Sequence, residues 1–581
     1  MMNEPLIPAK ADMAMMPEAY RTAMPKYERK KKESRFAAMK QEAARWLVSW
    51  KELSEQQRPT RGFFEGKNPN DGSVVNHKKL IDSTPVRAVR TLAAGFTSGL
   101  SSPSRPWFKI GVQDPDMMDD AEVRQWLDVV QERMAAVFSG SNIYGVLHSV
   151  YEEIGVFGTS ALLLVSDFKT VIRARLFTAG EYYLATDKDG RVNAFAREYW
   201  MTIGQMEDAF GLENLCASSQ ALYKEGKVDT WVKVYHLIEE NEVADNEMMD
   251  NQNMAYASCY WETTIGEDKF LKVSGFHSMP ILAPRWDTTT SAYVYGFGPG
   301  WDGLGDCKML QKLQSEKLMA LALMNKPPVQ ADATVQGVPN MMPGGVTRSS
   351  SIAPNAGVKA TYQVQPDLQA IDATIAQTQR AIIATFYADL FAMLMQQDQR
   401  AMTAREVVER HSERLLLLGP VLERLESELL DPLIERTFEI MLEAGLIPPP
   451  PAILQDNELE ITYISILAQA QRMVALTGIE QAVAFTAHAM AIDPAAADGT
   501  NMDEAVSAYN DLIGVPPRIA RSKADIAKMR ESRAQAQQAA AQQAQVAEAA
   551  KTAKTASETP LGQNSALDAL LGPTGPGGPA Q

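Results

Sequence analysis

Residues Thr403 to Gly445 carry a helical pattern that is too long for one compact domain core. Thr403 with Glu406 is a capping-box signature for the start of a helix, and Gly445 stands where a C′ glycine ends one. At about 1.5 Å per residue the pattern corresponds to roughly 60 Å of helix. Pro420 and Pro432 each remove a backbone hydrogen bond, so we expect kinks there. A helix of this length indicates an element that spans a larger assembly.

Two more long helices are predicted at 302–326 and 367–395, each with apolar residues along one face. Pro327-Pro328 end the first of them. The segment 327–366 is rich in Pro, Gly and Val and has no helical period. We therefore expect a hairpin of two helices with a small irregular or strand-like tip.

The hydrophobic period changes to that of strands between Ser160 and Trp286, with Asp189-Gly190 as a hairpin turn. Helical patterns lie on both sides of this β-rich insert, and they include a first helix with a basic face near the N-terminus. The predicted fold class is α+β, mainly α-helical. At 581 residues the chain is long enough for several domains.

The charge balance is acidic, with 56 Lys and Arg against 72 Asp and Glu and a formal net charge of -16. A protein that grips DNA usually carries a basic face. If nucleic acid is a partner, we expect this chain to let it pass and not to bind it tightly. The first helix carries a basic cluster that could contact nucleic acid or an acidic partner, although a solvated helix face is the alternative; its residues are Lys30, Lys31, Lys32 and Arg35.

Signatures of catalysis, metal binding and cofactor binding are missing from the sequence. The three cysteines lie far apart, the six histidines form no H-E-x-x-H motif, and no phosphate-binding loop of the Walker type is present. The glycine-dense run Tyr295–Asp306 precedes a helix and could bind an anion, but Asp302 and Asp306 would repel phosphate, so a flexible hinge is expected. We predict no enzyme activity, no catalytic residue, no metal and no cofactor.

No apolar run reaches the ~18–20 residues of a membrane span, and the first residues do not resemble a signal peptide. We expect a soluble protein made in the cytoplasm. The chain is predicted to be helical again from Asn457 to Met529. Beyond that, an Ala/Gln-rich segment has high helix propensity but few large apolar residues, so it either stacks on copies of itself or stays loose.

Several segments, in this order, resemble the head-to-tail connector (portal) family of podoviruses. They extend over about residues 60 to 530, and none is a catalytic signature. They are PVRAVRTLAAGFTSGLSSPSRPWF, YEEIGVFGTSALLL, YGFGPGWDGLGDCKMLQKLQ, the PGG of Pro343–Gly345, MTAREVVER, LLGPVLERLESELLDPLIERTFEIM, LAQAQR and GVPPRI.

The resemblance implies a portal-type subunit that assembles into a ring, a dodecamer, around a DNA channel. It divides the chain into an N-terminal helical and β-rich wing region at 1–301, a first stem helix at 302–326, a clip at 327–366, a second stem helix at 367–395, a channel loop at 396–402, a long kinked wing helix at 403–456, a crown at 457–530, and an Ala/Gln-rich, partly disordered tail at 531–581. The channel loop then contains Gln396, Gln397, Asp398, Gln399 and Arg400.

The implied partners are double-stranded DNA that passes without sequence recognition, the major capsid and scaffold proteins, the large terminase subunit and a tail adaptor. The implied location is the head-tail vertex of the virion, after assembly in the host cytoplasm. Two other classes stay open. Another phage structural or scaffold protein would tend to be continuous helix, which the β-rich insert speaks against. A packaging NTPase would need the phosphate loop that the sequence lacks.

Overall fold

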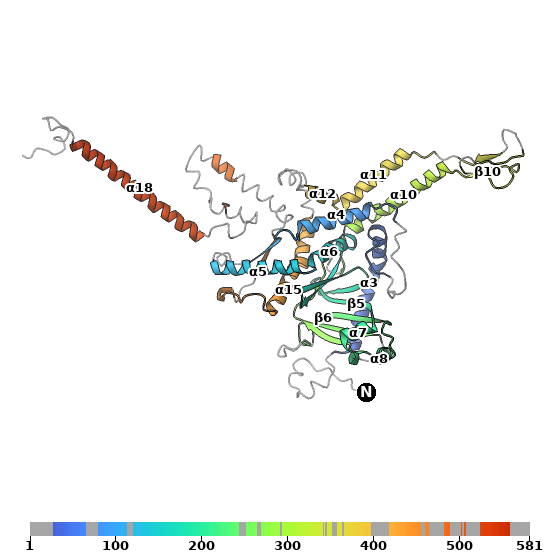
Figure 1. Cartoon of the computed structure of the whole chain (residues 1–581), viewed down its shortest axis with the longest axis horizontal. Coiled ribbons are helices and arrows are strands. Elements are labelled where there is room, and N and C mark those ends of the chain that lie inside the picture. Colours follow the sequence, from blue (N-terminus) through green and yellow to red (C-terminus); the bar gives the residue numbers. More distant parts are fainter. Residues whose placement is uncertain are drawn as a thin grey trace, which may run out of the picture.

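The computed structural model shows a mainly helical body with a five-stranded sheet, from which a long helical hairpin projects (Figure 1). The structure describes residues 27–64, 80–112, 120–242, 244, 251–263, 269–290, 293–340, 342, 345–350, 357–362, 365–396, 418–454, 459–463, 482–488, 501, 505–506 and 523–557. The predicted fold class, α+β and mainly α-helical, is confirmed. Among the described helices, none combines the length and the apolar composition that crossing a membrane requires.

The helices of the body and of the hairpin follow one another along most of the chain. The α-helices are α3 (Arg29–Gln57), α4 (Thr84–Gly99), α5 (Ala121–Gly140), α6 (Ile143–Phe157), α7 (Ile203–Phe210), α8 (Ala217–Lys224), α9 (Pro299–Asp302), α10 (Leu304–Asn325), α11 (Leu368–Thr385), α12 (Ala388–Gln396), α14 (Gly419–Leu425), α15 (Asp431–Glu443) and α18 (Lys523–Ser557). Short 3₁₀ turns lie at η4 (Leu212–Asn214) and η7 (Ala452–Leu454), and a π-turn lies at η6 (Glu426–Leu430).

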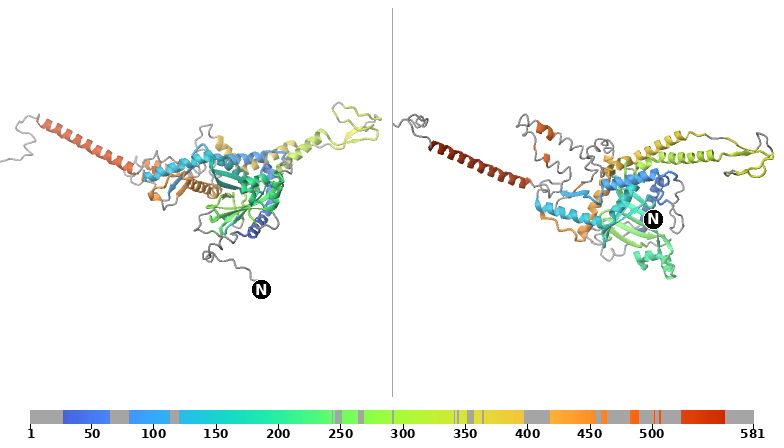
Figure 2. Two further views of the ribbon diagram at one scale, coloured as in Figure 1. Left: turned by 60° about the horizontal axis from the view of Figure 1, so that its bottom comes forward. Right: turned by 45° about the horizontal axis from the view of Figure 1, so that its top comes forward.

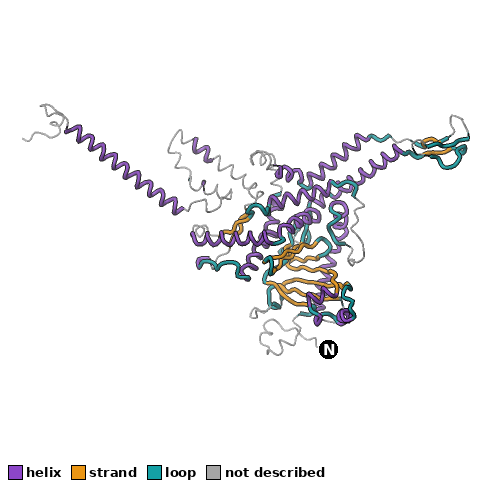
Figure 3. The backbone as a smooth tube through the Cα atoms, in the orientation of Figure 1, coloured by secondary structure: helices purple, strands orange, loops and turns teal. Residues whose placement is uncertain are grey.

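The expected β-rich insert is confirmed, since strands β2 to β9 all lie within it. The five-stranded antiparallel sheet has the order β4-β5-β6-β7-β8, and a three-stranded sheet has the order β3-β2-β9. Figure 3 draws the strands in orange. The predicted turn at Asp189-Gly190 joins β4 to β5, with Gly190 at a positive φ of 83°. The strands are β2 (Ala161–Asp167), β3 (Val171–Phe177), β4 (Tyr182–Thr186), β5 (Val192–Thr202), β6 (Trp231–Glu240), β7 (Tyr256–Glu262), β8 (Lys272–Phe276) and β9 (Ile281–Leu282).

Helix α3 covers one face of the five-stranded sheet. Its Phe36 is 5% exposed and meets the rings of Tyr183, Tyr235 and Trp261 edge to face, at centroid distances of 5.2 to 5.9 Å. Each such aromatic pair contributes about 0.5–1.5 kcal/mol beyond its buried area. Lys40 adds an ion pair to Glu198 of β5 at 2.9 Å. The first described helix is thereby fixed to the β-rich insert.

The predicted long helix of Thr403 to Gly445 is described from Leu418 onward, so its capping box lies outside the described residues. Pro420 lies in the first turn of α14 as described, and the kink predicted there stays a prediction because residues 403–417 lie outside the described residues. Pro432 cannot donate to the carbonyl four residues earlier, and the helix widens there into the π-turn η6. The predicted end is confirmed, with Gly445 at a φ of 67° after α15.

Two sequence expectations are corrected by contacts between distant segments. The stretch after Asn457 was expected to be helical, but β12 (Leu459–Tyr463) is a strand that pairs antiparallel with β1 (Phe108–Val112). The expected helix at 367–395 is broken into α11 and α12 at Phe386-Tyr387, where Tyr387 has a φ of 52°. Phe386 is fully buried at this break. In both places tertiary packing overrides the local pattern.

Candidate functional site: a projecting helical hairpin

Helices α10 and α11 lie side by side and carry their connecting segment away from the body (Figures 1 and 2). Helix α10 has 22 residues and is therefore roughly 33 Å long. Lys317 of α10 forms an ion pair with Asp372 of α11 at 2.5 Å. At the tip, β10 (Val329–Ala331) pairs antiparallel with β11 (Val358–Ala360). The expected hairpin with a small strand-containing tip is confirmed.

One carboxylate holds the base of the hairpin. Asp82 accepts hydrogen bonds at one oxygen from the backbone N–H and hydroxyl of Thr84, at 2.7 and 2.6 Å. Its other oxygen accepts from Gln314 of α10 at 2.9 Å and from Gln379 of α11 at 2.8 Å. Gln311 returns a bond to the Asp82 carbonyl at 2.9 Å. Burial would raise the pKa of Asp82, but these hydrogen bonds outweigh it and lower the pKa below 3.8.

The sequence signals only part of this cluster. Asp82, Thr84 and Pro85 are typical of a helix start, so the contact between Asp82 and Thr84 was predictable. The two glutamines that complete it lie more than 200 residues further along the chain. Their hydropathy pattern does not distinguish them from other polar residues of a helix surface.

The glycine-dense run before α10 is a tight crossing of two chain segments. A Cβ on Gly296 would lie 2.7 Å from the carbonyl oxygen of Gly158, and one on Gly300 would lie 2.2 Å from that of Val156. Trp301 stabilises the crossing, because its Nε1 donates a hydrogen bond to the Phe157 carbonyl at 2.9 Å. Backbone thus packs against backbone along this run, which speaks against the flexible hinge expected there.

The hairpin presents apolar surface that the subunit itself does not cover. Met319 of α10 is 65% exposed, and Val338 at the tip is 94% exposed. Burying one such side chain contributes about 1.5–3 kcal/mol. The exposed large apolar side chains of α10 are Met309, Leu318, Met319, Leu321 and Met324, and those of the tip are Val338, Met342, Val346 and Tyr362. So many exposed large apolar side chains on one projecting element are typical of a contact with another chain.

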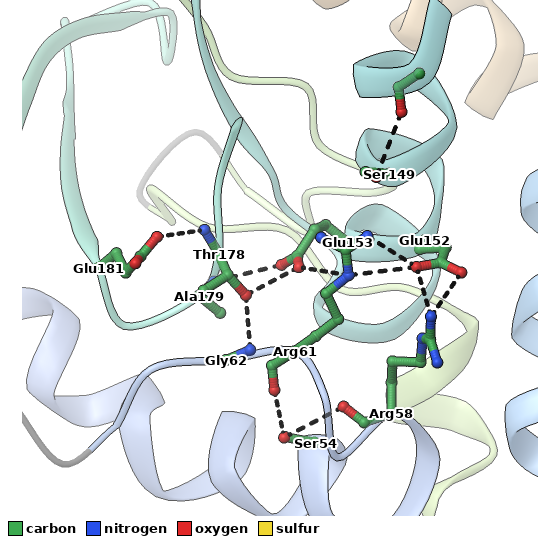
Figure 4. A network of polar contacts seen from close by, with 11 residues as sticks. Ser54, Arg58, Arg61, Gly62, Ser149, Glu152, Glu153, Thr178, Ala179 and Glu181 are labelled. Carbon is green, nitrogen blue, oxygen red and sulfur yellow. Dashed lines mark hydrogen bonds and ion pairs between the residues drawn. The ribbon is translucent and has the colours of Figure 1, made fainter. Parts of the chain in front are cut away.

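A buried network of charges joins the end of α3 to α6 (Figure 4). Arg58 and Arg61 reach the carboxylate of Glu152 at 3.2 and 3.0 Å. Glu153 accepts a hydrogen bond from Thr178 at 2.9 Å, and burial raises its pKa to about 7 although Arg61 opposes the shift. Glu152 and Glu153 are buried, so these charges connect the end of α3 to α6 in the interior of the subunit.

The basic cluster on α3 is largely engaged within the chain. Lys32 and Arg35 form ion pairs with Glu239 of β6 at 2.5 and 3.6 Å, and Lys31 pairs with Glu28 at 3.3 Å. Lys30 is exposed. The cluster thus holds α3 on the sheet, and its contact with nucleic acid stays a prediction.

Of the residues predicted for the channel loop, the structure describes only the first. Gln396 is the last residue of α12, whereas Gln397, Asp398, Gln399 and Arg400 lie outside the described residues. Within the described ranges, no group of three or more His, Cys, Asp or Glu side chains could hold a metal ion. Cys216, Cys259 and Cys307 are buried and unpaired by disulfides.

The model of the bacteriophage head to tail connecting protein family matches residues 29–520. The chain belongs to this family. It is 38% identical to the portal protein of Salmonella phage epsilon15 over 540 residues, which is 93% of this chain and 97% of the relative. It is also 38% identical to the probable portal protein of Bordetella phage BPP-1 over 511 residues, 88% of this chain and 92% of the relative.

A distant resemblance to a solved structure accompanies these matches. A chain from the virion of a native gene transfer agent particle aligns with 81% of this chain and 93% of its own length. Its sequence identity is 12% and its TM-score is 0.34, values too low to support an argument about function.

Proposed function

We propose that the chain is the portal subunit of a short-tailed phage, and that copies of it form a ring at one capsid vertex. The ring is the channel through which the genome is packaged and ejected. The observation that carries this proposal is the set of large apolar side chains of α10 that one subunit leaves exposed. Side-by-side copies in a closed ring would bury these side chains, because every copy then contacts a neighbour on each side.

Within this ring, α10 and α11 are the stem and the segment 327–366 is the clip, on which the terminase and the tail adaptor dock in turn. The subunit number is twelve by resemblance. The wing comprises residues 1–301 and the long helix of 403–456, the crown is 457–530, and the tail is 531–581. The capsid and scaffold proteins contact the ring during head assembly, and the structure supports this division through the position of the hairpin alone.

The channel loop at 396–402 is the part that approaches DNA most closely in this proposal. Arg400 is its single basic residue, and one such residue per subunit makes a collar of positive charge in an acidic ring. Contacts of this kind with phosphate are weak, salt-sensitive and blind to sequence. The net charge of -16 per subunit supports free passage of DNA over the remaining surface.

The test of ring formation uses the purified full-length chain without cofactor. Negative-stain images should show closed rings with a central hole, and light scattering should give a mass many times 63.9 kDa. A monomer at all concentrations would overturn the proposal. Nucleotide hydrolysis should stay at the background of a buffer control, because the relatives are portal proteins and the sequence lacks a phosphate loop. Nucleotide hydrolysis that copurifies with the ring would contradict the non-enzymatic role.

A further inference from the structure

The five-stranded sheet carries a polar row on the face opposite α3. Arg197 of β5 lies beside His236 of β6, which lies beside Tyr260 of β7. Side chains alternate between the two faces of a strand. Because Tyr235 contacts α3 through Phe36, its neighbour His236 points to the other side. The His236 and Tyr260 rings stack with centroids 3.8 Å apart.

Arg197 places a positive charge in this row without a carboxylate beside it. The residue is 5% exposed. Its Nε donates to Nδ1 of His236 at 3.2 Å, and the Tyr260 hydroxyl is hydrogen-bonded to the guanidinium. In the part of the chain that the structure describes, no Asp or Glu forms an ion pair with it. A guanidinium has more N–H donors than these two acceptors use.

The histidine cannot share or offset this charge. Nδ1 of His236 accepts from Arg197, so the imidazole proton lies on Nε2, which donates to the Ser258 hydroxyl at 3.0 Å. Burial, together with the positive charges of Arg197 and Arg175, holds the pKa of His236 well below 6.5. The ring is therefore neutral, and the charge of the cluster belongs to the two arginines.

Arg175 of β3 brings a second positive charge to the same place. Its guanidinium carbon lies 5.6 Å from the centre of the Phe177 ring, and that of Arg197 lies 4.9 Å from the same centre. Arg197 also stacks on Tyr199 at 4.1 Å. Arg175 is exposed and forms no ion pair with the described acidic residues. The two charges repel each other, and among the described residues no carboxylate forms an ion pair with either of them.

The buried acidic residue of the same sheet face is already used elsewhere, and Glu240 of β6, which lies on that face too, is exposed. Glu262 of β7 accepts from the Cys216 N–H and from the Ser219 hydroxyl, both at 2.5 Å, at the start of α8. Its two carboxylate oxygens bind these donors and not Arg197. Buried arginines are ordinarily paired, because an isolated charge loses its hydration without compensation. Among the described residues no carboxylate offsets the charge of Arg197, which leaves a place for a negative group from an anion or another chain.

We propose that Arg197 and Arg175 form a binding site for an oxyanion, with Arg197 at its floor and Arg175 at its entrance. The planar edge of a guanidinium matches the two oxygens of a carboxylate or phosphate. Two sources share this chemistry: a dissolved phosphate, and an Asp or Glu side chain of a second copy of the chain. The site lies in the β-rich insert, on other elements than the hairpin of α10 and α11.

Thermal unfolding of the full-length chain in sodium phosphate tests the site, against sodium chloride at equal ionic strength. Subunits and rings are separated by size and measured in parallel. In wild-type subunits the midpoint should rise with phosphate and saturate, since a ligand that binds only the folded state stabilises it. Arg175→Gln should weaken the apparent affinity about tenfold. Arg173→Gln is the matched control, because Arg173 is exposed on the same strand two residues away.

The two sources give different results. A phosphate response in subunits and in rings identifies a dissolved anion. If a carboxylate of a neighbouring copy fills the site, phosphate leaves the thermal midpoint of the rings unchanged. In that case Arg175→Gln lowers the midpoint of the rings, whereas Arg173→Gln does not. The proposal is overturned if neither state responds to phosphate and the two variants have the same midpoint in both states. Arg175→Gln changes an exposed residue, so the test does not depend on replacing buried Arg197.

Discussion

At the scale of single residues, the hairpin depends on polar and glycine positions as much as on apolar ones. Asp82 joins the start of α4 to α10 and α11 through one carboxylate. Gly158 and Gly296 let two backbones cross where any side chain would collide. Sequence reasoning predicted neither role, because both depend on which distant segment arrives at the site. It did predict Gly445 as a helix end, since that role is local.

Replacing Asp82 by Asn should lower the free energy of unfolding by about 1–3 kcal/mol, because the amide presents one acceptor oxygen where the carboxylate uses two. The pKa of Asp82 is lowered in the folded state, so its contribution is complete above the ordinary value of 3.8 and declines as pH falls through the folded-state pKa. Denaturant titrations at neutral pH and below about pH 4 measure this. Glu316→Gln on α10 is the control, because its partner Lys312 is exposed and 3.8 Å away. A difference between wild type and Asp82→Asn that does not shrink in acid would contradict the assignment.

Gly158→Ala should destabilise the subunit more than Gly226→Ala does. Both glycines have a positive φ, at 80° and 77°, so alanine costs about 1–2 kcal/mol in backbone conformation at either position. At Gly158 the new Cβ would also lie 2.4 Å from the Gly296 carbonyl oxygen, whereas at Gly226 nothing lies within 4 Å. The collision should add at least about 2 kcal/mol. Chemical denaturation of both variants isolates this steric part; equal losses would mean that the crossing is loose.

At the scale of elements, the sequence predicts well those features that depend on neighbouring residues. Pro327-Pro328 end α10, and alternation in β3 marks its buried face. The pairing of β1 with β12 joins residues some 350 positions apart, and the local pattern of neither strand predicts which strand it pairs with. The break at Tyr387 likewise depends on packing, since residues 367–395 are a good helical sequence. The polar row of Arg197 was missed because its members are far apart in sequence and each has an ordinary strand context.

Deleting the chain after Arg530 should leave ring assembly intact. Helix α18 is almost entirely exposed, and Val546 is its one exposed large apolar residue beyond that point within the described range. Such a segment buries too little apolar surface to supply a major interface. Size-exclusion chromatography with light scattering compares the truncated chain with the full-length one. Loss of rings, with the circular dichroism of the remaining subunit unchanged, would show that the Ala/Gln-rich helices are an essential contact.

At the scale of the whole molecule, the exposed apolar side chains of the hairpin lie outside the core of the subunit. The body has its own continuous core, which extends from α3 to α15. The hairpin contributes little to that core beyond its base, where Leu310 and Ile382 are buried. Its outer length therefore has apolar side chains that do not stabilise the isolated fold. Their replacement should affect assembly and leave folding alone.

Changing Leu318 and Met324 of α10 to Glu should therefore prevent ring formation without unfolding the subunit. These side chains are 56% and 46% exposed, so charges there meet water in the single subunit. In a ring they would be buried against a neighbour, and burying an unpaired carboxylate costs several kcal/mol at every interface. Val546→Glu on α18 is the matched control, because Val546 is 69% exposed and lies outside the hairpin. Light scattering should give monomers for the double variant and rings for the control, with equal thermal midpoints for the subunits. Rings in the double variant would place the contact between copies on another surface, and monomers in both would mean that added negative charge alone disperses the ring.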